Sequence, residues 1–292
     1  MNFISKKNNE VRRARPLLGT FVEISAGGLK NEKLHQAINQ AFESVELVHQ
    51  LMSFHDPKSD LSKLNLSAFK RPVKLHRFTY QVLKTCQKIS RATGGLFDCT
   101  VAPSLMQWGY LPKVSGSSCF QGNFKDIELL PSEKVAFKRP LCIDLGGIAK
   151  GYAVDLAVAT LEHEGVSFGC VNAGGDLKFF GKKQPLYIRS PKHPGSFIFF
   201  GQAQNLAVAT SSSYFSGKSF GREKVSPLIN PLTRKPCVED SSVSVFASSC
   251  MIADALTKAV VACGDRNPDF LKRFRAKAVI LEARGITPAP KT

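Results

Sequence analysis

Residues 142–155 read CIDLGGIAKGYAVD and residues 171–181 read VNAGGDLKFFG, two glycine-rich stretches that decide how this chain folds. In the first, an apolar strand enters a glycine turn and then a helix, whose free N–H groups suit a phosphate. Glycine lets the backbone approach a ligand closely, and Lys150 adds a positive charge. The second has a turn at Gly174 and Gly175, followed by Asp176. Two ordinary structural turns are the alternative. Neither stretch is a GxGxxG fingerprint, so a Rossmann fold is not indicated.

Helical and extended patterns alternate around these stretches. Apolar residues recur at helical spacing in 31–52, 76–93, 148–164 and 249–263, and residues 59–65 resemble a short capped turn of helix. Alternating or β-branched segments predict strands in 17–26, 166–181, 185–190, 196–210, 242–247 and 277–283. Residues 111–140 read as a surface loop with room for one short strand. We therefore expect a basic flexible tail at 1–15 and one α+β domain at 16–286, a mixed sheet flanked by helices.

The charge of the chain favours anionic partners. Its 40 Lys and Arg residues against 23 Asp and Glu give a net charge of +17. These basic residues are scattered, so we read them as a solvated surface and expect no nucleic acid partner. A purely electrostatic binding module is the alternative from another class, and it would bind no flavin.

The cysteines and the apolar runs bear on the compartment. The eight cysteines form no CxxC pair and several lie in apolar strings, which is typical of reduced, buried side chains. We see no apolar run long enough to span a membrane and no signal peptide. The expected location is therefore cytoplasmic, with the periplasm as the alternative.

The predicted helix at 249–263 carries a polar stripe. Asp254, Thr257 and Lys258 are spaced so that they share one face of an otherwise apolar helix. Such a stripe has to face water, a ligand or a metal. The alternative is a simple Asp–Lys surface pair one turn apart.

Five segments in the same order resemble the FAD:protein FMN transferase (ApbE) family. The central one is Asp144 to Asp155, DLGGIAKGYAVD. The others are Leu18–Gly19–Thr20, the stretch 51–65 with His55, the stretch 93–109 with Leu96, Phe97 and Asp98, and Ala253 to Thr257. Each is weak alone, but five in one order are specific. The resemblance implies an ApbE-like, T-fold-like domain.

The family resemblance also implies a chemistry. Members cleave FAD with Mg²⁺, attach FMN to a Thr or Ser hydroxyl of an acceptor protein and release AMP, which is a phosphoryl transfer. Carried over by position, the FAD-contacting residues are Leu18, His55, Leu96, Phe97, Asp98, Asp144, Lys150, Gly174, Gly175, Asp176 and Leu228. The implied metal ligands are the Gly147 carbonyl and Asp254, and the implied catalytic residues are Asp254, Thr257 and Lys258.

The chain departs from the family pattern at several of these positions. Lys258 stands at the metal position, where the family has a metal-binding Thr, and its ammonium could supply the charge that a metal usually contributes. The alternative is that Thr257, which lies one position early, replaces the missing metal ligand after a small rotation. Pro227 and Asn230 replace a His and an Asp of the family, and His55 stands where a Tyr or Trp usually stacks on the flavin. We interpret the chain as a divergent transferase. The alternatives are an FAD pyrophosphate hydrolase and a catalytically inactive FAD-binding protein.

Overall fold

The fold is built on a large antiparallel sheet. The structure is a computed structural model and describes residues 10–114, 119–193, 195–214, 216–265, 268–282 and 285–286. The strand order of the sheet is β1-β2-β6-β7-β10-β13-β14-β15. These strands are β1 (Glu10–Leu17), β2 (Thr20–Gly27), β6 (Phe168–Ala173), β7 (Asp176–Phe180), β10 (Leu206–Ser212), β13 (Ser241–Ala247), β14 (Lys277–Glu282) and β15 (Gly285–Ile286). The expected helix-flanked α+β fold is confirmed. Strand directions are not mixed in this sheet, because every neighbouring pair in it is antiparallel.

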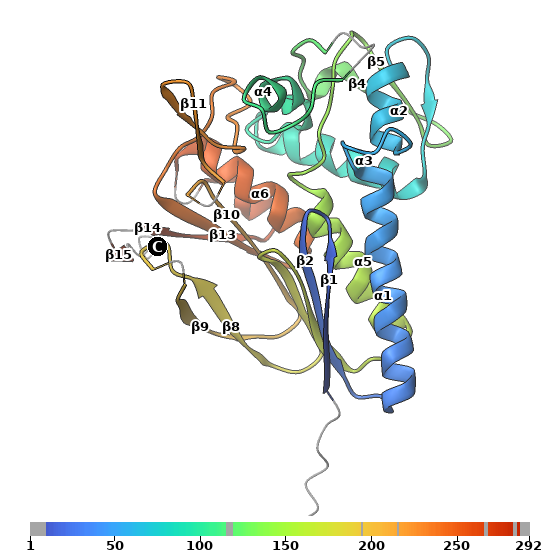
Figure 1. Cartoon of the computed structure of the whole chain (residues 1–292), viewed down its shortest axis with the longest axis vertical. Coiled ribbons are helices and arrows are strands. Elements are labelled where there is room, and N and C mark those ends of the chain that lie inside the picture. The colour runs from blue at the N-terminus through green and yellow to red at the C-terminus, as the bar shows by residue number, and fades with distance from the viewer. Residues whose placement is uncertain are drawn as a thin grey trace, which may run out of the picture.

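Three helices cover one face of the sheet: α1 (Asn31–Met52), α5 (Ala149–His163) and α6 (Cys250–Cys263) (Figure 1). Their apolar stripes and the inward residues of the strands form the main core, in which Ile24, Phe42 and Val245 are fully buried. Local signals fix the ends of α6. The Ser249 side chain accepts the Ile252 N–H at its start, and Gly264 ends it with φ 68°, a conformation that glycine adopts without strain.

The remaining elements form a helical cap and two hairpins. The cap, at the top of Figure 1, contains α2 (Asp60–Ser67), β3 (Val73–Lys74), α3 (Arg77–Ala92), the 3₁₀ turns at Cys99–Val101 and Phe124–Asp126, α4 (Ala102–Gln107), β4 (Ile127–Leu130) and β5 (Lys134–Phe137). The hairpins are β8 (Gln184–Arg189) with β9 (Phe197–Ala203), and β11 (Lys218–Phe220) with β12 (Glu223–Val225); a short helix, α7 (Phe270–Arg273), precedes β14. The β8–β9 hairpin packs on the sheet face opposite the helices, in a second small core.

The N-terminal prediction needs a correction. Residues 10–15, expected in a flexible tail, belong to β1, and residues 1–9 lie outside the described part. The single strand expected at 17–26 is one arm of a hairpin, which turns through Leu18 and Gly19 with φ of 57° and 71°. Arginines made this segment look unstructured, but charged side chains are typical of an edge strand, where they discourage pairing with other chains.

Two expectations about the 111–140 region and the cysteines also change. The region contains the paired strands β4 and β5, where one short strand was expected. Cys119 and Cys142 form a disulfide, so the expectation of reduced, buried cysteines is wrong for this pair. The other six cysteines carry free thiols. The predicted helices at 31–52, 76–93, 148–164 and 249–263 are confirmed to within one or two residues at their ends.

Candidate functional site

The site begins where α5 and α6 meet backbone to backbone. Gly151 lies in the first turn of α5, and a Cβ atom there would come within 2.3 Å of the Cys250 carbonyl oxygen. Its N–H, which has no partner within the first turn of a helix, donates to Asp254 Oδ2 at 3.1 Å. The glycine-rich stretch 142–181 and the helix that carries Asp254 are therefore adjacent in space.

Asp155 fixes the start of α6 against α5. One turn after Gly151, its carboxylate accepts from Ser249 Oγ at 2.7 Å and from the backbone N–H groups of Cys250 and Met251 at 3.0 and 2.9 Å. It also pairs with Lys178 of β7 at 2.8 Å. A carboxylate at a helix N-terminus satisfies open N–H groups and interacts favourably with the helix dipole. The position of Asp254, one turn further along α6, follows from this anchor.

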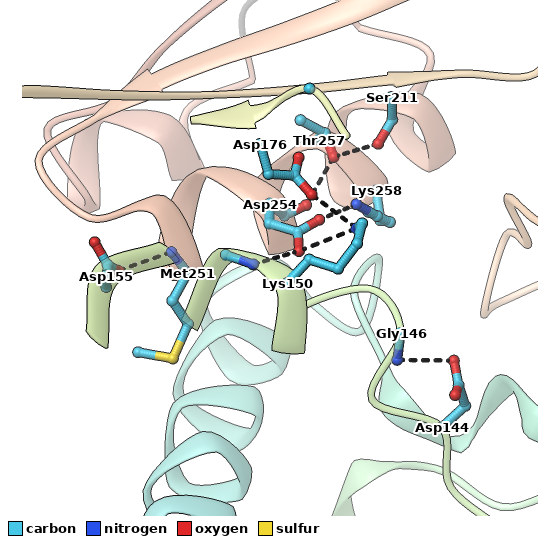
Figure 2. Close-up of polar contacts among 12 residues, drawn as sticks. Asp144, Gly146, Lys150, Asp155, Asp176, Ser211, Met251, Asp254, Thr257 and Lys258 are labelled. Carbon is cyan, nitrogen blue, oxygen red and sulfur yellow. Dashed lines mark hydrogen bonds and ion pairs between the residues drawn. The ribbon is translucent and has the colours of Figure 1, made fainter. Parts of the chain in front are cut away.

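Four charged side chains form what we call the ion cluster: Lys150, Asp176, Asp254 and Lys258 (Figure 2). Lys150 Nζ lies 2.7 Å from Asp176 Oδ2 and 3.6 Å from Asp254 Oδ2. Lys258 pairs with the other carboxylate oxygen of Asp254, Oδ1. The side chain of Asp254 is 0% exposed, whereas those of Lys150 and Lys258 are 28% and 20% exposed. Buried carboxylates are thus paired with two lysine side chains that are partly exposed.

The cluster holds its charges through mutual attraction. Burial disfavours the charge on Lys150, but Asp176 and Asp254 raise the pKa of its ammonium group above the ordinary value. Burial also acts to raise the pKa of Asp254, yet the charges of Lys150 and Lys258 outweigh it and leave that pKa below its ordinary value. For Asp176, burial and the negative charge of Asp254 raise the pKa despite Lys150. Asp254 is therefore the firmly ionised member of the two carboxyl groups.

Backbone turns from three segments surround the cluster. A Cβ on Gly147 would lie 3.6 Å from both Lys258 Cε and Phe97, so Gly147 sits between the lysine stem and the cap. In the turn before Asp176, Gly174 has φ 63° and packs on Thr20, where a Cβ would meet Oγ1 at 2.6 Å. Gly175 N–H donates to Asn172 Oδ1 at 2.9 Å, a contact that the sequence reading missed. Both stretches quoted from the sequence thus end at this site.

Several residues assigned to FAD by resemblance lie outside the ion cluster. Asp144 is beside Gly146, whose N–H it accepts at 3.0 Å, and burial raises its pKa (Figure 2). His55 is exposed in the connection between α1 and α2, and Leu228 lies half-buried beyond β12. Leu18 is part of the β1–β2 turn and donates its N–H to His49 Nδ1 at 3.2 Å, another contact that the sequence did not indicate.

The carboxylate of Asp98 is occupied by backbone groups. Its two oxygens accept the N–H groups of Thr100 and Phe124, each at 2.9 Å. Burial raises its pKa. Phe97 is buried and Leu96 is half-buried in the same segment. Asp98 therefore connects the cap segment that ends at Phe124 to the turn that carries Phe97, and its role in this structure is to stabilise the cap.

Thr257 faces away from the ammonium of Lys258. It is fully buried, donates to the Asp254 carbonyl oxygen at 2.7 Å and lies 2.7 Å from Ser211 Oγ of β10. Figure 2 shows this pair on the sheet side of α6. The hydroxyl group that we considered as a replacement metal ligand is therefore engaged in two hydrogen bonds.

A Mg²⁺ ion, implied by the resemblance, finds few available ligands here. Magnesium needs near-octahedral oxygen coordination at short distances. Asp254 directs one oxygen to Lys258 and the other to Gly151 and Lys150. No group of three His, Cys, Asp or Glu side chains suited to a metal occurs in the part of the chain that the structure describes. Both carboxylate oxygens of Asp254 are already paired with lysine ammonium groups or with a backbone N–H, so these residues do not form a Mg²⁺ site.

Known proteins resemble this chain over most of its length. A relative named FAD:protein FMN transferase from Vibrio cholerae is 26% identical over 281 residues, which is 89% of this chain and 83% of the relative. One of the same name from Treponema pallidum is 24% identical and covers 91% of this chain and 82% of its own. The crystal structure of the ApbE protein of Thermotoga maritima shares the fold, with a TM-score of 0.81, 24% identity and 97% coverage of both chains. The model of the ApbE family matches residues 18–281, so this protein belongs to the ApbE family.

Proposed function

We propose that this protein is an FAD:protein FMN transferase, which moves FMN from FAD to a Thr or Ser hydroxyl of an acceptor protein and releases AMP. The observation that carries the proposal is the ion cluster, in which two partly exposed lysine side chains pair with buried carboxylates beside the N-terminus of α5. A pyrophosphate needs fixed cationic hydrogen-bond donors, which the two ammonium groups supply. Family membership supplies the flavin nucleotide as the compound that carries the pyrophosphate.

The reaction is one substitution at the phosphorus atom of the FMN half. The acceptor hydroxyl oxygen forms a bond to that phosphorus, the bond from phosphorus to the bridging pyrophosphate oxygen breaks, and AMP leaves with the electron pair. The hydroxyl proton passes to solvent or to the departing phosphate. Alignment and charge neutralisation make up most of the catalysis in such transfers. Lys150 and Lys258 are the groups placed to neutralise the charge, and Asp176 and Asp254 hold them in position.

The departures at Pro227 and Asn230 lie in a loop outside this cluster, whereas Lys258 is a member of it. Asn230, where the family has Asp, accepts the N–H groups of Leu232 and Thr233 at 2.9 and 3.1 Å, and donates to the Ala262 carbonyl at 3.0 Å. It therefore ties this loop to the end of α6. Pro227 leaves the same loop without the family His, so a proton acceptor for the hydroxyl at that position is not part of our proposal.

The compartment stays a prediction. The cytoplasm was expected, but disulfides such as Cys119–Cys142 are typical of oxidising compartments and favour the periplasmic alternative. None of the described helices is long and apolar enough to cross a bilayer.

The decisive experiment is to incubate the protein with FAD, Mg²⁺ and a Thr-containing acceptor domain, and to measure the mass of the acceptor and the nucleotide products. A gain equal to one FMN moiety, with AMP released, is the expected result. FMN and AMP without a change in acceptor mass would identify the hydrolase instead. Bound FAD that stays intact would identify the inactive binding protein.

A further inference from the structure

The ammonium of Lys258 lies among the groups that the family resemblance assigns to a metal. Lys258 pairs with Oδ1 of Asp254, the implied metal carboxylate. Its stem runs along Gly147, the implied carbonyl ligand, since a Cβ there would be 3.6 Å from Cε and 3.7 Å from Cγ. The lysine is therefore enclosed by the residues that would otherwise surround a divalent cation.

The charges of the ion cluster balance without a metal. In their charged forms, Asp176 and Asp254 contribute two negative charges, and Lys150 and Lys258 contribute two positive charges. A divalent cation on Asp254 would have to displace Lys258 and would then face two ammonium groups at short range, where repulsion is strong. With threonine at position 258, Asp254 would lose one counter-charge and gain a hydroxyl oxygen beside it.

The hydroxyl group of Thr257 cannot act as a metal ligand in the observed orientation of α6. Thr257 is about 100° round the helix from Lys258, and its oxygen is engaged with Ser211 and the Asp254 carbonyl. Using it as a ligand would break both contacts in a fully buried place. Among the described residues of α6, Lys258 pairs with Asp254 through its ammonium and packs on Gly147 through its methylene stem.

We infer that Lys258 replaces the divalent cation of this site, so that the protein binds the FAD pyrophosphate without Mg²⁺. The inference rests on the proposed function, because it names how that site neutralises its substrate. A lysine ammonium donates up to three hydrogen bonds and carries a permanent charge, both of which suit phosphate oxygens. One N–H group of the ammonium donates to Asp254, which leaves its other two N–H groups for a ligand.

The test measures FAD binding by quenching of flavin fluorescence, in EDTA and in excess Mg²⁺, for the wild type and for Lys258→Thr. We expect the wild type to bind FAD equally well in both buffers, within about twofold. Lys258→Thr should bind FAD in Mg²⁺ but at least about tenfold more weakly in EDTA, because a charged hydrogen-bonding partner has been removed. Calorimetric titration with Mg²⁺ in the absence of FAD should show a binding site in Lys258→Thr and none in the wild type.

Two matched variants control for folding and for overall charge. Lys258→Arg keeps the cation and should retain binding in EDTA. Lys272→Thr makes the same substitution in an exposed Asp–Lys pair on α7, at 3.0 Å from Asp269, and should behave as the wild type does. Thermal unfolding of each variant shows whether it is folded before binding is measured.

The possible outcomes separate the inference from the proposed function. Wild-type binding that falls tenfold or more in EDTA would overturn the role of Lys258 and leave the transferase proposal in place. Equal FAD binding by Lys258→Thr in both buffers would also overturn the inferred role of Lys258. The contact between Lys258 and Asp254 would then be an ion pair without a role in FAD binding. No FAD binding in either buffer by the folded wild type would overturn the proposed function itself.

Discussion

Replacing Gly151 with alanine tests whether the contact between α5 and α6 is as close as the structure has it. The added methyl group would lie 2.3 Å from the Cys250 carbonyl oxygen, 2.6 Å from its carbon and 2.8 Å from Met251 Cα. All three atoms belong to the backbone, so no side chain can rotate out of the way. Helix α6 has to move as a whole, and the Gly151 N–H bond to Asp254 has to lengthen or break.

The expected cost follows from these contacts. Overpacking costs about 1–3 kcal/mol, and losing a hydrogen bond to a charged acceptor costs about 1.5–3 kcal/mol. Alanine returns about 1 kcal/mol of helix propensity. We therefore expect Gly151→Ala to lower the free energy of unfolding by about 1.5–5 kcal/mol.

Urea unfolding followed by circular dichroism measures this loss. Gly195→Ala is the matched control, because a Cβ there meets nothing within 4 Å and the backbone φ is not positive. Restricting the unfolded chain at such a position is neutral or stabilises by up to about 1 kcal/mol. If Gly151→Ala unfolds at the same urea concentration as Gly195→Ala, the two helices do not meet as described.

Three further predictions concern the anchor of α6, a buried carboxyl group and the cysteines. Asp155→Asn should lower the free energy of unfolding, measured in urea, by about 1–3 kcal/mol, because two backbone N–H groups and Lys178 lose a charged partner. The control is Asp269→Asn in an exposed ion pair, which should change this free energy by less than about 0.5 kcal/mol. Equal effects would contradict the anchoring role. Since burial raises the folded-state pKa of Asp98 above its ordinary 3.8, the fold binds this proton more tightly than the unfolded chain does. As the pH is lowered from 7 toward 4, the free energy of unfolding of the wild type minus that of Asp98→Asn should therefore increase. A value that decreases or stays constant would refute this. Alkylation of the unreduced, denatured protein should label six thiols by mass, and eight after reduction; eight without reduction would exclude the Cys119–Cys142 bond.

The sequence by itself predicted the elements whose signals are local. Apolar spacing located α1, α3, α5 and α6 because a helix repeats every 3.6 residues and shows its buried stripe in a short window. The glycines at 146, 147, 174 and 175 indicated turns because their conformational freedom is a property of the residue itself. The order of the motifs was enough to indicate the ApbE family, although each motif alone was weak.

Only the tertiary structure decided which of these residues meet. Strand β1 escaped prediction because an edge strand depends on its partner β2 and carries arginines that also suit a tail. The disulfide joins cysteines 23 positions apart, and pairing of that kind leaves no local trace. Likewise, the stripe on α6 showed that Asp254, Thr257 and Lys258 share a helix surface, but not that Thr257 turns to Ser211 while Lys258 turns to Gly147. The packing of α6 between α5 and the sheet separates those two side chains, because the direction in which a helix faces is set by what it packs against.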